Sequence, residues 1–189
     1  MGLPESRLLL KLPLLTVEEL THEKRLIVHR GVFSAVCLVF YLPSGEEYFL
    51  TVRQYRTAAS AVFYEHPAGM IEPSEDPIEG ALRELAEETG WLLTKDDIIP
   101  LTPHSLYPSP AIWREEGYFF AARLQVPKPL IDSYQADPIR ETKEEQLRLA
   151  AIPKEKLPQL TRNLQTIAHT FLYYAHFGAP DGKLPSLFG

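Results

Sequence analysis

Three glutamates close together in the sequence are the first residues whose types and spacing could do chemistry. Glu84, Glu87 and Glu88 fall within residues 76–90, and at about 100° per residue of a helix their side chains gather on one face. Glu84 and Glu88 are one turn apart, where like charges repel by about 0.2–0.5 kcal/mol. A hard divalent cation such as magnesium prefers carboxylate oxygens and would relieve that repulsion. A solvated acidic helix face is the alternative interpretation.

The local sequence predicts the helix that these acids need, from Pro77 to Thr89. Asp76 is a good N-cap, Pro77 suits the first turn, and Glu79 can complete a capping box with Asp76. Gly90 can adopt the left-handed conformation that ends a helix. A neighbouring face of this helix should pack on the core through a stripe of mostly apolar residues, Ile78, Ala81, Leu82, Leu85 and Thr89.

The segment around this helix also matches a complete family pattern. The fixed positions are Gly69, Glu75, Arg83-Glu84-Leu85, Glu87-Glu88, Gly90 and the hydrophobic Trp91. This pattern resembles the Nudix box, with every fixed position filled and Trp91 where an aliphatic residue is usual. The resemblance implies an α/β fold of the Nudix type, an α/β/α sandwich with a mixed sheet. It also implies an enzyme that hydrolyses a diphosphate bond.

The resemblance further implies a role for each polar residue of the box. Glu84 and Glu88 would be the main ligands of Mg²⁺, with Mn²⁺ as a possible substitute, and Glu87 would contribute directly or through water. The carbonyl of Ala68 would complete the inner shell, and Arg83 would orient a glutamate, here Glu87. Metal ions lower the pKa of a bound water, and a carboxylate then accepts its proton. We therefore expect Arg83, Glu84 and Glu87 to be catalytic.

Two segments before the box resemble the branch that hydrolyses ADP-ribose and other nucleoside diphosphate sugars. Residues 52–56 resemble a strand of that branch ending in Gln-Tyr/Phe-Arg, and residues 65–69 resemble its Glu-x-Pro-Ala-Gly entry to the box. By this resemblance Arg56 would contact the diphosphate, Glu65 a ribose or the metal network, and Arg53 the substrate as well. The alternatives are a surface arginine at 56 and, at 65, a carboxylate that only orders the box loop.

The segment after the box matches that branch less well. Ser109-Pro110-Ala111 corresponds in part to a Ser-Pro-Gly-type loop, with alanine in place of glycine. Pro110 is the candidate substrate-binding residue of this loop. Tyr107 lies about where hydrolases of dinucleoside polyphosphates carry a tyrosine. The sequence therefore leaves the group on the far side of the diphosphate open.

A further acid usually comes from a loop before a late strand in this branch. Residues 144–153 resemble that segment, and Glu145 is the predicted base or third metal ligand. Glu144 and Glu141 are alternatives, and a solvated loop rich in Lys and Glu is another interpretation. Four aromatic residues could stack on a base, although core packing is favoured for the last two: Trp113, Tyr107, Phe33 and Tyr41.

The function expected from these residues is Mg²⁺-dependent hydrolysis of ADP-ribose or a related nucleoside diphosphate sugar to a nucleoside monophosphate and a sugar phosphate. A second possibility is a hydrolase of dinucleoside polyphosphates, NADH or damaged nucleotides. A third is a sensor domain that binds nucleotide sugars without turnover. The filled acidic stripe disfavours the third possibility, because binding alone does not require it.

The remaining elements follow from apolar periodicity and turn residues. We expect strands over residues 25–30, 32–42, 47–54, 62–65, 117–124 and 146–152. A closing helix is expected over residues 157–177, and proline-rich loops over 100–112 and around Pro127, Pro129 and Pro138. Strands and helices interleave without a regular βαβ repeat, which favours a mixed α/β class with helices on the sheet faces.

Length and composition fit one catalytic domain acting on a small molecule. We expect a single domain over residues 1–189, with residues 1–60 as an antiparallel β region that contributes to a homodimer and 61–189 as the catalytic core. The net charge of −6 argues against a nucleic-acid partner. Without a long apolar stretch we expect no membrane span. The single Cys37 lies in an apolar run, which suits a buried thiol and a cytoplasmic location.

Overall fold

The computed structural model describes residues 5–135 and 148–182. The strands are β1 (Ser6–Leu12), β2 (Leu15–Leu20), β3 (Arg25–Tyr41), β4 (Glu47–Arg56), β5 (Ala61–Glu65), β6 (Ala68–Met70), β7 (Ile98–Pro100), β8 (Trp113–Gln125) and β9 (Arg148–Pro153). The α-helices are α1 (Pro77–Thr89), α2 (Lys128–Gln135), α3 (Leu157–Leu160) and α4 (Leu164–Phe177). Short 3₁₀ turns cover Thr57–Ala59, Lys95–Asp97 and Pro180–Gly182.

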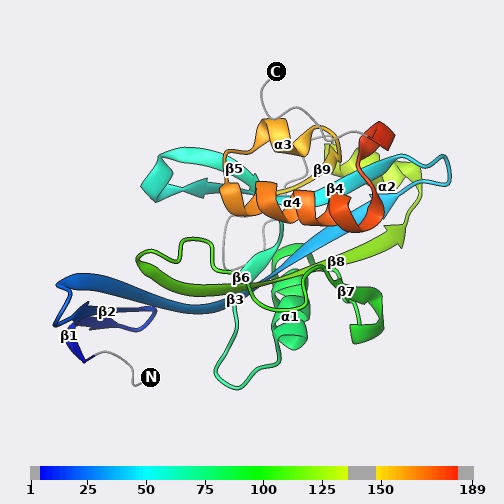
Figure 1. Ribbon diagram of the computed structural model, residues 1–189. Coiled ribbons are helices and arrows are strands. Elements are labelled where there is room, and N and C mark those ends of the chain that lie inside the picture. Colours follow the sequence, from blue (N-terminus) through cyan, green and yellow to red (C-terminus); the bar gives the residue numbers. More distant parts are fainter. Residues whose placement is uncertain (1–4, 136–147, 183–189) are drawn as a thin grey trace.

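The strands of the described residues form one mixed sheet (Figure 1). The order along its main path is β1-β2-β3-β4-β5, with β8 and β6 also paired to β3, β9 paired to β4, and β7 paired to β8. β3 and β8 run parallel, whereas β3 is antiparallel to β2, β4 and β6. The expected mixed α/β sheet is therefore confirmed.

Helices pack on both faces of this sheet, and successive side chains of β3 point to alternate faces. Val36, Leu38 and Phe40 face a core that includes residues of α1 and α2. Cys37 and Val39 face a second core with α3 and α4. Because successive strand residues point to opposite faces, one strand supplies both cores. This arrangement is the expected α/β/α sandwich.

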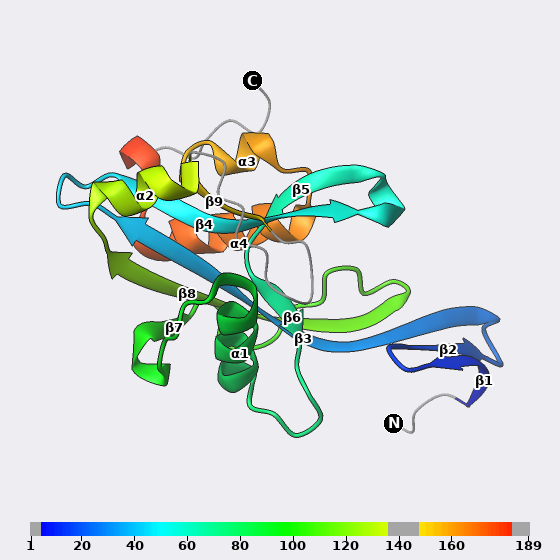
Figure 2. The ribbon, with the colours of Figure 1, turned by 180° about the vertical axis from the view of Figure 1, so that it is seen from behind.

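The N-terminal strands form an arm that projects from the body (Figures 1 and 2). β1, β2 and the first part of β3 pair in antiparallel order. The expected N-terminal antiparallel β extension is therefore present. Its first strand carries large apolar side chains that are 44–55% exposed, namely Leu8, Leu9, Leu10 and Leu12.

The prediction of two strands over residues 25–30 and 32–42 was wrong, because β3 is continuous from Arg25 to Tyr41. Gly31 has φ of 101° and lies where the pairing of β3 with β8 shifts register after His29. A glycine with positive φ is the residue that a bulge of this kind favours. Gly31 therefore bends one long strand and does not end it.

The prediction of a loop around Pro127, Pro129 and Pro138 is confirmed at Pro127 but wrong at Pro129, which lies in α2, and Pro138 lies outside the described residues. α2 places Ile131 and Tyr134 in the core. Pro129 lies in the first turn of this helix, where its missing N–H does no harm. Proline content was a poor guide because the apolar spacing of the following residues favours a short amphipathic helix.

The single closing helix expected over residues 157–177 is divided in two. α3 ends at Leu160, and α4 begins at Leu164. Asn163 caps α4: its side-chain oxygen accepts hydrogen bonds from the N–H groups of Gln165 (2.9 Å) and Thr166 (3.3 Å). The break therefore has a local cause, the N-cap that apolar periodicity alone does not reveal.

Both ends of α1 agree with the local sequence. The Asp76 carboxylate accepts a hydrogen bond from Ile78 N–H at 2.9 Å, and Gly90 has φ of 76° and donates to Ala86 O at 2.9 Å. The expected stripe packs inward: Ala81, Leu85 and Thr89 are buried, and Ile78 and Leu82 pack against the same core.

Two smaller expectations about the body have clear outcomes. Glu79 bonds to Lys95 Nζ at 2.7 Å, so the interaction seen for its carboxylate lies outside the expected capping box. Cys37 is fully buried, and burial raises the pKa of its thiol well above the ordinary value, as expected for a structural thiol. Within the described residues, no helix is long and apolar enough to cross a membrane.

Removing the N-cap of α1 should lower stability without changing the fold. We expect Asp76→Ala to reduce the free energy of unfolding by about 1 kcal/mol and Tm by about 2–4 °C. The matched control is Asp76→Asn, which keeps a side-chain acceptor for Ile78 N–H and should unfold close to the wild-type temperature. Thermal unfolding followed by circular dichroism measures both. Equal Tm values for the two variants would contradict this role of Asp76.

Candidate active site

The loop before α1 is fixed against the central strand of the sheet. β6 pairs with β3, which places Gly69 opposite Ser34 and Ala68 opposite Ala35. Just before β6, Pro67 O accepts a hydrogen bond from Val36 N–H at 2.9 Å. Backbone atoms near Gly69 are therefore held in place by the sheet, and α1 packs over them.

The carboxylate of Glu84 lies directly against the backbone of Gly69. A Cβ atom added at Gly69 would lie 2.0 Å from the carboxyl carbon of Glu84 and about as close to both of its oxygens. A side chain at position 69 would push the Glu84 carboxylate away, so only glycine keeps this close approach. The fixed glycine of the box thus has a steric reason.

The other two acids of the stripe differ in their contacts. Glu88 accepts a hydrogen bond from Ala68 N–H at 3.0 Å, so it also reaches the box loop. Glu87 has 55% of its side chain exposed and lies 3.4 Å from Arg83 Nη1. Glu84 and Glu88 therefore converge on residues 68–69 from α1, while Glu87 is more open to solvent.

Arg83 connects the helix to the loop that precedes it. Its guanidinium forms two hydrogen bonds of 3.0 Å with Glu75, one of 2.8 Å with Glu84 and one of 2.9 Å with Met70 O. The expected partner Glu87 is reached only at 3.4 Å. The main partner of Arg83 is therefore Glu75, whose carboxylate takes the planar two-bond geometry that arginine favours.

The two acids beside Arg83 are shifted in opposite directions. Hydrogen bonds from Arg83 are the main cause that lowers the pKa of Glu75. Burial is the main cause for Glu84 and outweighs the effect of Arg83, so its pKa is raised above the ordinary value. A further positive charge beside Glu84 would therefore oppose the effect of its burial.

The donors at this loop fit a hard divalent cation by their chemistry. Magnesium prefers oxygen ligands. This loop offers the carboxylate oxygens of Glu84 and Glu88 and the backbone carbonyl oxygen of Ala68. In the parts of the chain that the structure describes, no three Asp, Glu, His or Cys side chains form a ready ligand cluster. Glu84 instead bonds to Arg83, and Glu88 accepts from Ala68 N–H. A cation would compete with these partners.

A cavity of about 440 Å³ opens beside the same loop. Ala68 and Gly69 line it, together with Arg56 and Glu65. Glu65 is only 5% exposed and accepts hydrogen bonds from Arg56 Nε (3.1 and 3.2 Å) and Nη2 (2.5 Å). Asn163 Nδ2 donates a further hydrogen bond of 2.9 Å to Glu65. Arg56, Glu65 and the box loop, predicted from separate motifs, therefore meet in one place.

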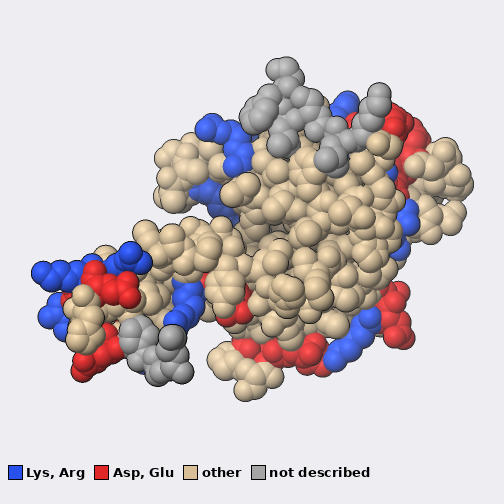
Figure 3. Space-filling view, in the orientation of Figure 1, with Lys and Arg blue, Asp and Glu red and all other residues tan. Residues whose placement is uncertain are grey.

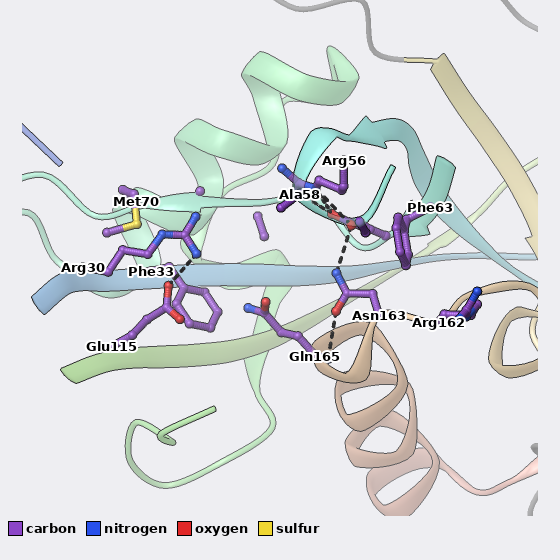
Figure 4. Close-up of a pocket in the computed structure, with 14 residues that line it drawn as sticks. Arg30, Phe33, Arg56, Ala58, Phe63, Met70, Glu115, Arg162, Asn163 and Gln165 are labelled. Carbon is purple, nitrogen blue, oxygen red and sulfur yellow. Dashed lines mark hydrogen bonds and ion pairs between the residues drawn. The ribbon is translucent and has the colours of Figure 1, made fainter. Parts of the chain in front are cut away.

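The opposite side of the cavity comes from β3 and β8 (Figure 4). Arg30 pairs with Glu115 at 3.0 Å, and the ring of Phe33 lies beside them. A Cβ atom at Gly117 would lie 2.1 Å from the Phe33 ring, so this glycine makes room for the ring. Figure 3 shows the hollow on this face between the β4–β5 hairpin and the arm, with basic side chains on both sides.

Other predicted site residues do not join this cavity. Arg53 lines a different cavity with Tyr64 and Arg148, because it is an odd number of positions from Arg56 on the same strand and so faces the other side. Pro110 lines a third cavity, near the arm. Glu145 and its alternatives Glu144 and Glu141 lie outside the described residues.

The aromatic candidates are also divided. Phe33 lines the Arg56 cavity but is only 4% exposed, and Tyr41 carries Arg123 over its ring at 5.2 Å. Tyr107 and Trp113 are 50% and 40% exposed and line the same cavity as Pro110. Of these four candidates, Phe33 therefore lies beside the box loop, in a cavity that Phe63 of β5 also lines.

Sequence reasoning missed several residues of the Arg56 cavity. They are Arg30, Glu115, Arg162, Asn163 and Gln165. An asparagine just before an apolar helical run is a recognisable N-cap signal for Asn163. The Arg30–Glu115 pair depends on the pairing of β3 with β8, for which no short motif exists.

Comparisons with known proteins match this chain to one family. Residues 32–164 match the NUDIX domain family. The chain is 30% identical over 158 residues to Nudix hydrolase 14, chloroplastic, of Arabidopsis thaliana, covering 78% of this chain and 50% of that protein. It is 30% identical over 100 residues to the ADP-ribose pyrophosphatase of Bacillus subtilis (strain 168), covering 53% and 49%.

The chain is also 47% identical over 45 residues to the ADP-sugar pyrophosphatase of Mus musculus. This shorter match covers 24% of this chain and 21% of that protein. The chain thus spans half or less of the length of these curated relatives. The family match, in contrast, covers most of the chain and contains the box loop, α1 and the Arg56–Glu65–Asn163 contacts. This chain belongs to the Nudix family.

Proposed function

We propose that this protein hydrolyses the diphosphate bond of ADP-ribose or a related nucleoside diphosphate sugar, with Mg²⁺ as cofactor. The products would be a nucleoside monophosphate and a sugar phosphate. The observation that carries the proposal is the position of Arg56: its guanidinium, held by buried Glu65, lines a cavity that Ala68 and Gly69 also line. The names of the B. subtilis and M. musculus relatives support the same substrate class.

Arg56 would bind the non-bridging oxygens of the diphosphate. Its side chain is 48% exposed while that of Glu65 is 6% exposed, so the arginine faces the cavity and the carboxylate lies behind it. The contacts of Glu65 are those of an orienting residue, because Arg56 and Asn163 already donate to both of its oxygens. Arg30 would add positive charge from the opposite wall.

Glu84, Glu88 and the Ala68 carbonyl would hold Mg²⁺, with Glu87 as a direct or water-mediated contributor and Mn²⁺ as a substitute. When bound, the cation would neutralise charge on the diphosphate and acidify water. Arg83 would keep Glu84 beside Gly69 through its bonds to Glu75 and Glu84. These residues together bring the water and the diphosphate to the same loop.

The reaction needs a base for the attacking water. The water oxygen forms a bond to one phosphorus, the bridging P–O bond breaks, and a carboxylate accepts the water proton. We propose Glu145 as this acid of the late loop, with Glu144 and Glu141 as alternatives. The bridging oxygen leaves with the second phosphate.

We further propose that two copies of this chain associate through the arm and that residues 1–60 contribute to this homodimer. The exposed leucines of β1, named above, give a strand at the edge of the sheet an apolar surface, and such surfaces and edges favour self-association. Arg30, Phe33 and Arg56 line the cavity from this region, so the core over residues 61–189 would not act alone. A cytoplasmic location stays a prediction, since one relative is named chloroplastic.

Wild-type protein should release AMP and ribose 5-phosphate from ADP-ribose in the presence of Mg²⁺, and Glu88→Gln should abolish this turnover. The amide removes the negative charge but keeps an oxygen that accepts from Ala68 N–H, so the Tm should not change. A panel of nucleoside diphosphate sugars and dinucleotides in ¹⁸O-water identifies the substrate and the phosphorus attacked.

The matched control for this variant is Glu79→Gln, which removes an acid of α1 that bonds to Lys95 away from the box loop. It should keep wild-type activity. Turnover by Glu88→Gln within about threefold of wild type would remove Glu88 from the metal site. No turnover of any diphosphate in the panel would overturn the proposed function.

Arg56 and Arg53 lie on the same strand, but we expect their alanine variants to differ in KM. Arg56→Ala should raise KM for ADP-ribose about 10-fold or more, the effect of losing a charged hydrogen bond to a phosphate. Arg53→Ala should leave KM near wild type, because Arg53 lines another cavity. Steady-state kinetics decides between them. An effect on KM confined to Arg53→Ala would assign the diphosphate contact to that residue instead.

Light scattering after size exclusion tests the dimer. We expect a mass near twice 21.5 kDa for the wild type and a return toward the monomer for Leu10→Glu, which places a charge among the exposed leucines of β1. Leu92→Glu is the control, because Leu92 is 85% exposed on the body. A wild-type monomer, or a dimer that Leu10→Glu leaves intact, would contradict the arm as the interface.

A further inference from the structure

Asn163 contacts the site and caps a helix with the same side chain. Its Oδ1 accepts from Gln165 N–H and Thr166 N–H, at 2.9 and 3.3 Å, and its Nδ2 donates to Glu65 at 2.9 Å. The amide orientation follows from these partners. The reversed orientation would place Oδ1 against a carboxylate and Nδ2 against two N–H donors.

The acceptor of the Nδ2 bond is a carboxylate that cannot rely on solvent. Glu65 is 5% exposed, and a buried carboxylate needs hydrogen-bond donors to offset the loss of water. Arg56 supplies donors from one side and Asn163 from the other (Figure 4). Without the Asn163 amide, the hydrogen bonds from Arg56 would be what remains of these contacts, and Glu65 would be free to move.

A second contact ties the same helix to the next residue of the chain. His66 is 3% exposed, and its Nε2 lies 2.9 Å from Thr170 Oγ1. Asn163 and Thr170 are two helical turns apart and so lie on one face of α4. The helix therefore holds Glu65 and His66, the pair that leads into Pro67, Ala68 and Gly69, at two points.

We propose that Asn163 is a positioning residue that holds Arg56 in its diphosphate-binding orientation through Glu65. The proposal rests on the proposed function for the identity of the ligand, but the Asn163–Glu65–Arg56 contacts exist without it. The Asn163 amide is engaged by Glu65 on one side and by the N–H groups of α4 on the other, so its role in the proposal is to orient Arg56. Its effect should therefore fall on substrate binding more than on the chemical step.

Asn163→Asp separates the two roles of the residue. Aspartate caps helices as well as asparagine does, so α4 should stay capped, but a carboxylate then faces Glu65 in place of a donor. We expect KM for ADP-ribose to rise about 10-fold with kcat within about threefold, as for the loss of a hydrogen bond to a charged group. The Kd for ADP-ribose, measured by calorimetry in EDTA, should rise by a similar factor.

A double variant should reverse part of this loss. In Glu65→Gln with Asn163→Asp, the amide and the carboxylate exchange places, so one donor and one negative charge remain between the two positions. We expect KM to fall back toward wild type. If the aspartate variant does not fold, KM and Kd are compared between wild type and Asn163→Ser, which keeps a capping oxygen without a charge.

The control is a change that weakens α4 and leaves the Glu65 contact alone. Ala168 is exposed on this helix, and Ala168→Gly should lower Tm by a few degrees with no change in KM. The ¹⁵Nε signal of Arg56 in the ligand-free protein should shift in Asn163→Asp and stay in place in Ala168→Gly.

The outcomes separate this inference from the proposed function. Unchanged KM, Kd and Arg56 signal in both Asn163→Asp and Asn163→Ser would reduce Asn163 to a helix cap and overturn the inference. If wild-type protein neither binds nor hydrolyses ADP-ribose, the proposed substrate is wrong. The Arg56 signal then still decides whether Asn163 controls the orientation of this arginine.

Discussion

The site depends on the close approach of the Glu84 carboxylate to the backbone of Gly69. A helix side chain occupies the position that any other residue at 69 would need for its own Cβ. Three other contacts maintain this approach: β6 pairs with β3 behind the loop, Glu88 bonds to Ala68 N–H, and Arg83 joins Glu84 to Glu75. A change to any of them would move an acid relative to the cavity.

The second constraint is the burial of a charge. Glu65 has almost no access to solvent, and its donors come from the end of β4 and from the N-cap of α4. A buried carboxylate of this kind loses its hydration and therefore depends on the donors that surround it. Residues far apart in sequence, Arg56 and Asn163, therefore have to be placed together by the fold before the cavity has its shape.

Local sequence predicts the parts of the protein whose causes are local. The ends of α1 were predictable because Asp76 and Gly90 cap their own helix, and the fixed positions of the box identified the acidic face. The meeting of Arg56 and Glu65 beside the box was implied by resemblance. Arg53 was grouped with Arg56 because they are neighbours in a motif, although strand parity places them on opposite faces.

Most of the parts that were not predicted depend on contacts distant in the chain. The cap of Asn163 that divides the expected helix over residues 157–177 is local, but the contact of the same side chain to Glu65 depends on the fold. Arg30 faces Glu115 because β3 and β8 are parallel neighbours. α2 depends on a place in the core for Ile131 and Tyr134. Such contacts appear only when the sheet order is known.

The alternation along β3 determines where the chain could accept a change in length. One residue inserted directly after Val36 would turn Cys37 and Val39 toward α1 and send Leu38 and Phe40 toward α4, exchanging their places in the two cores. The same insertion near Leu14, in the exposed turn between β1 and β2, would displace only strands of the arm. Insertions and deletions among homologous chains should therefore avoid the middle of β3 and collect in the arm.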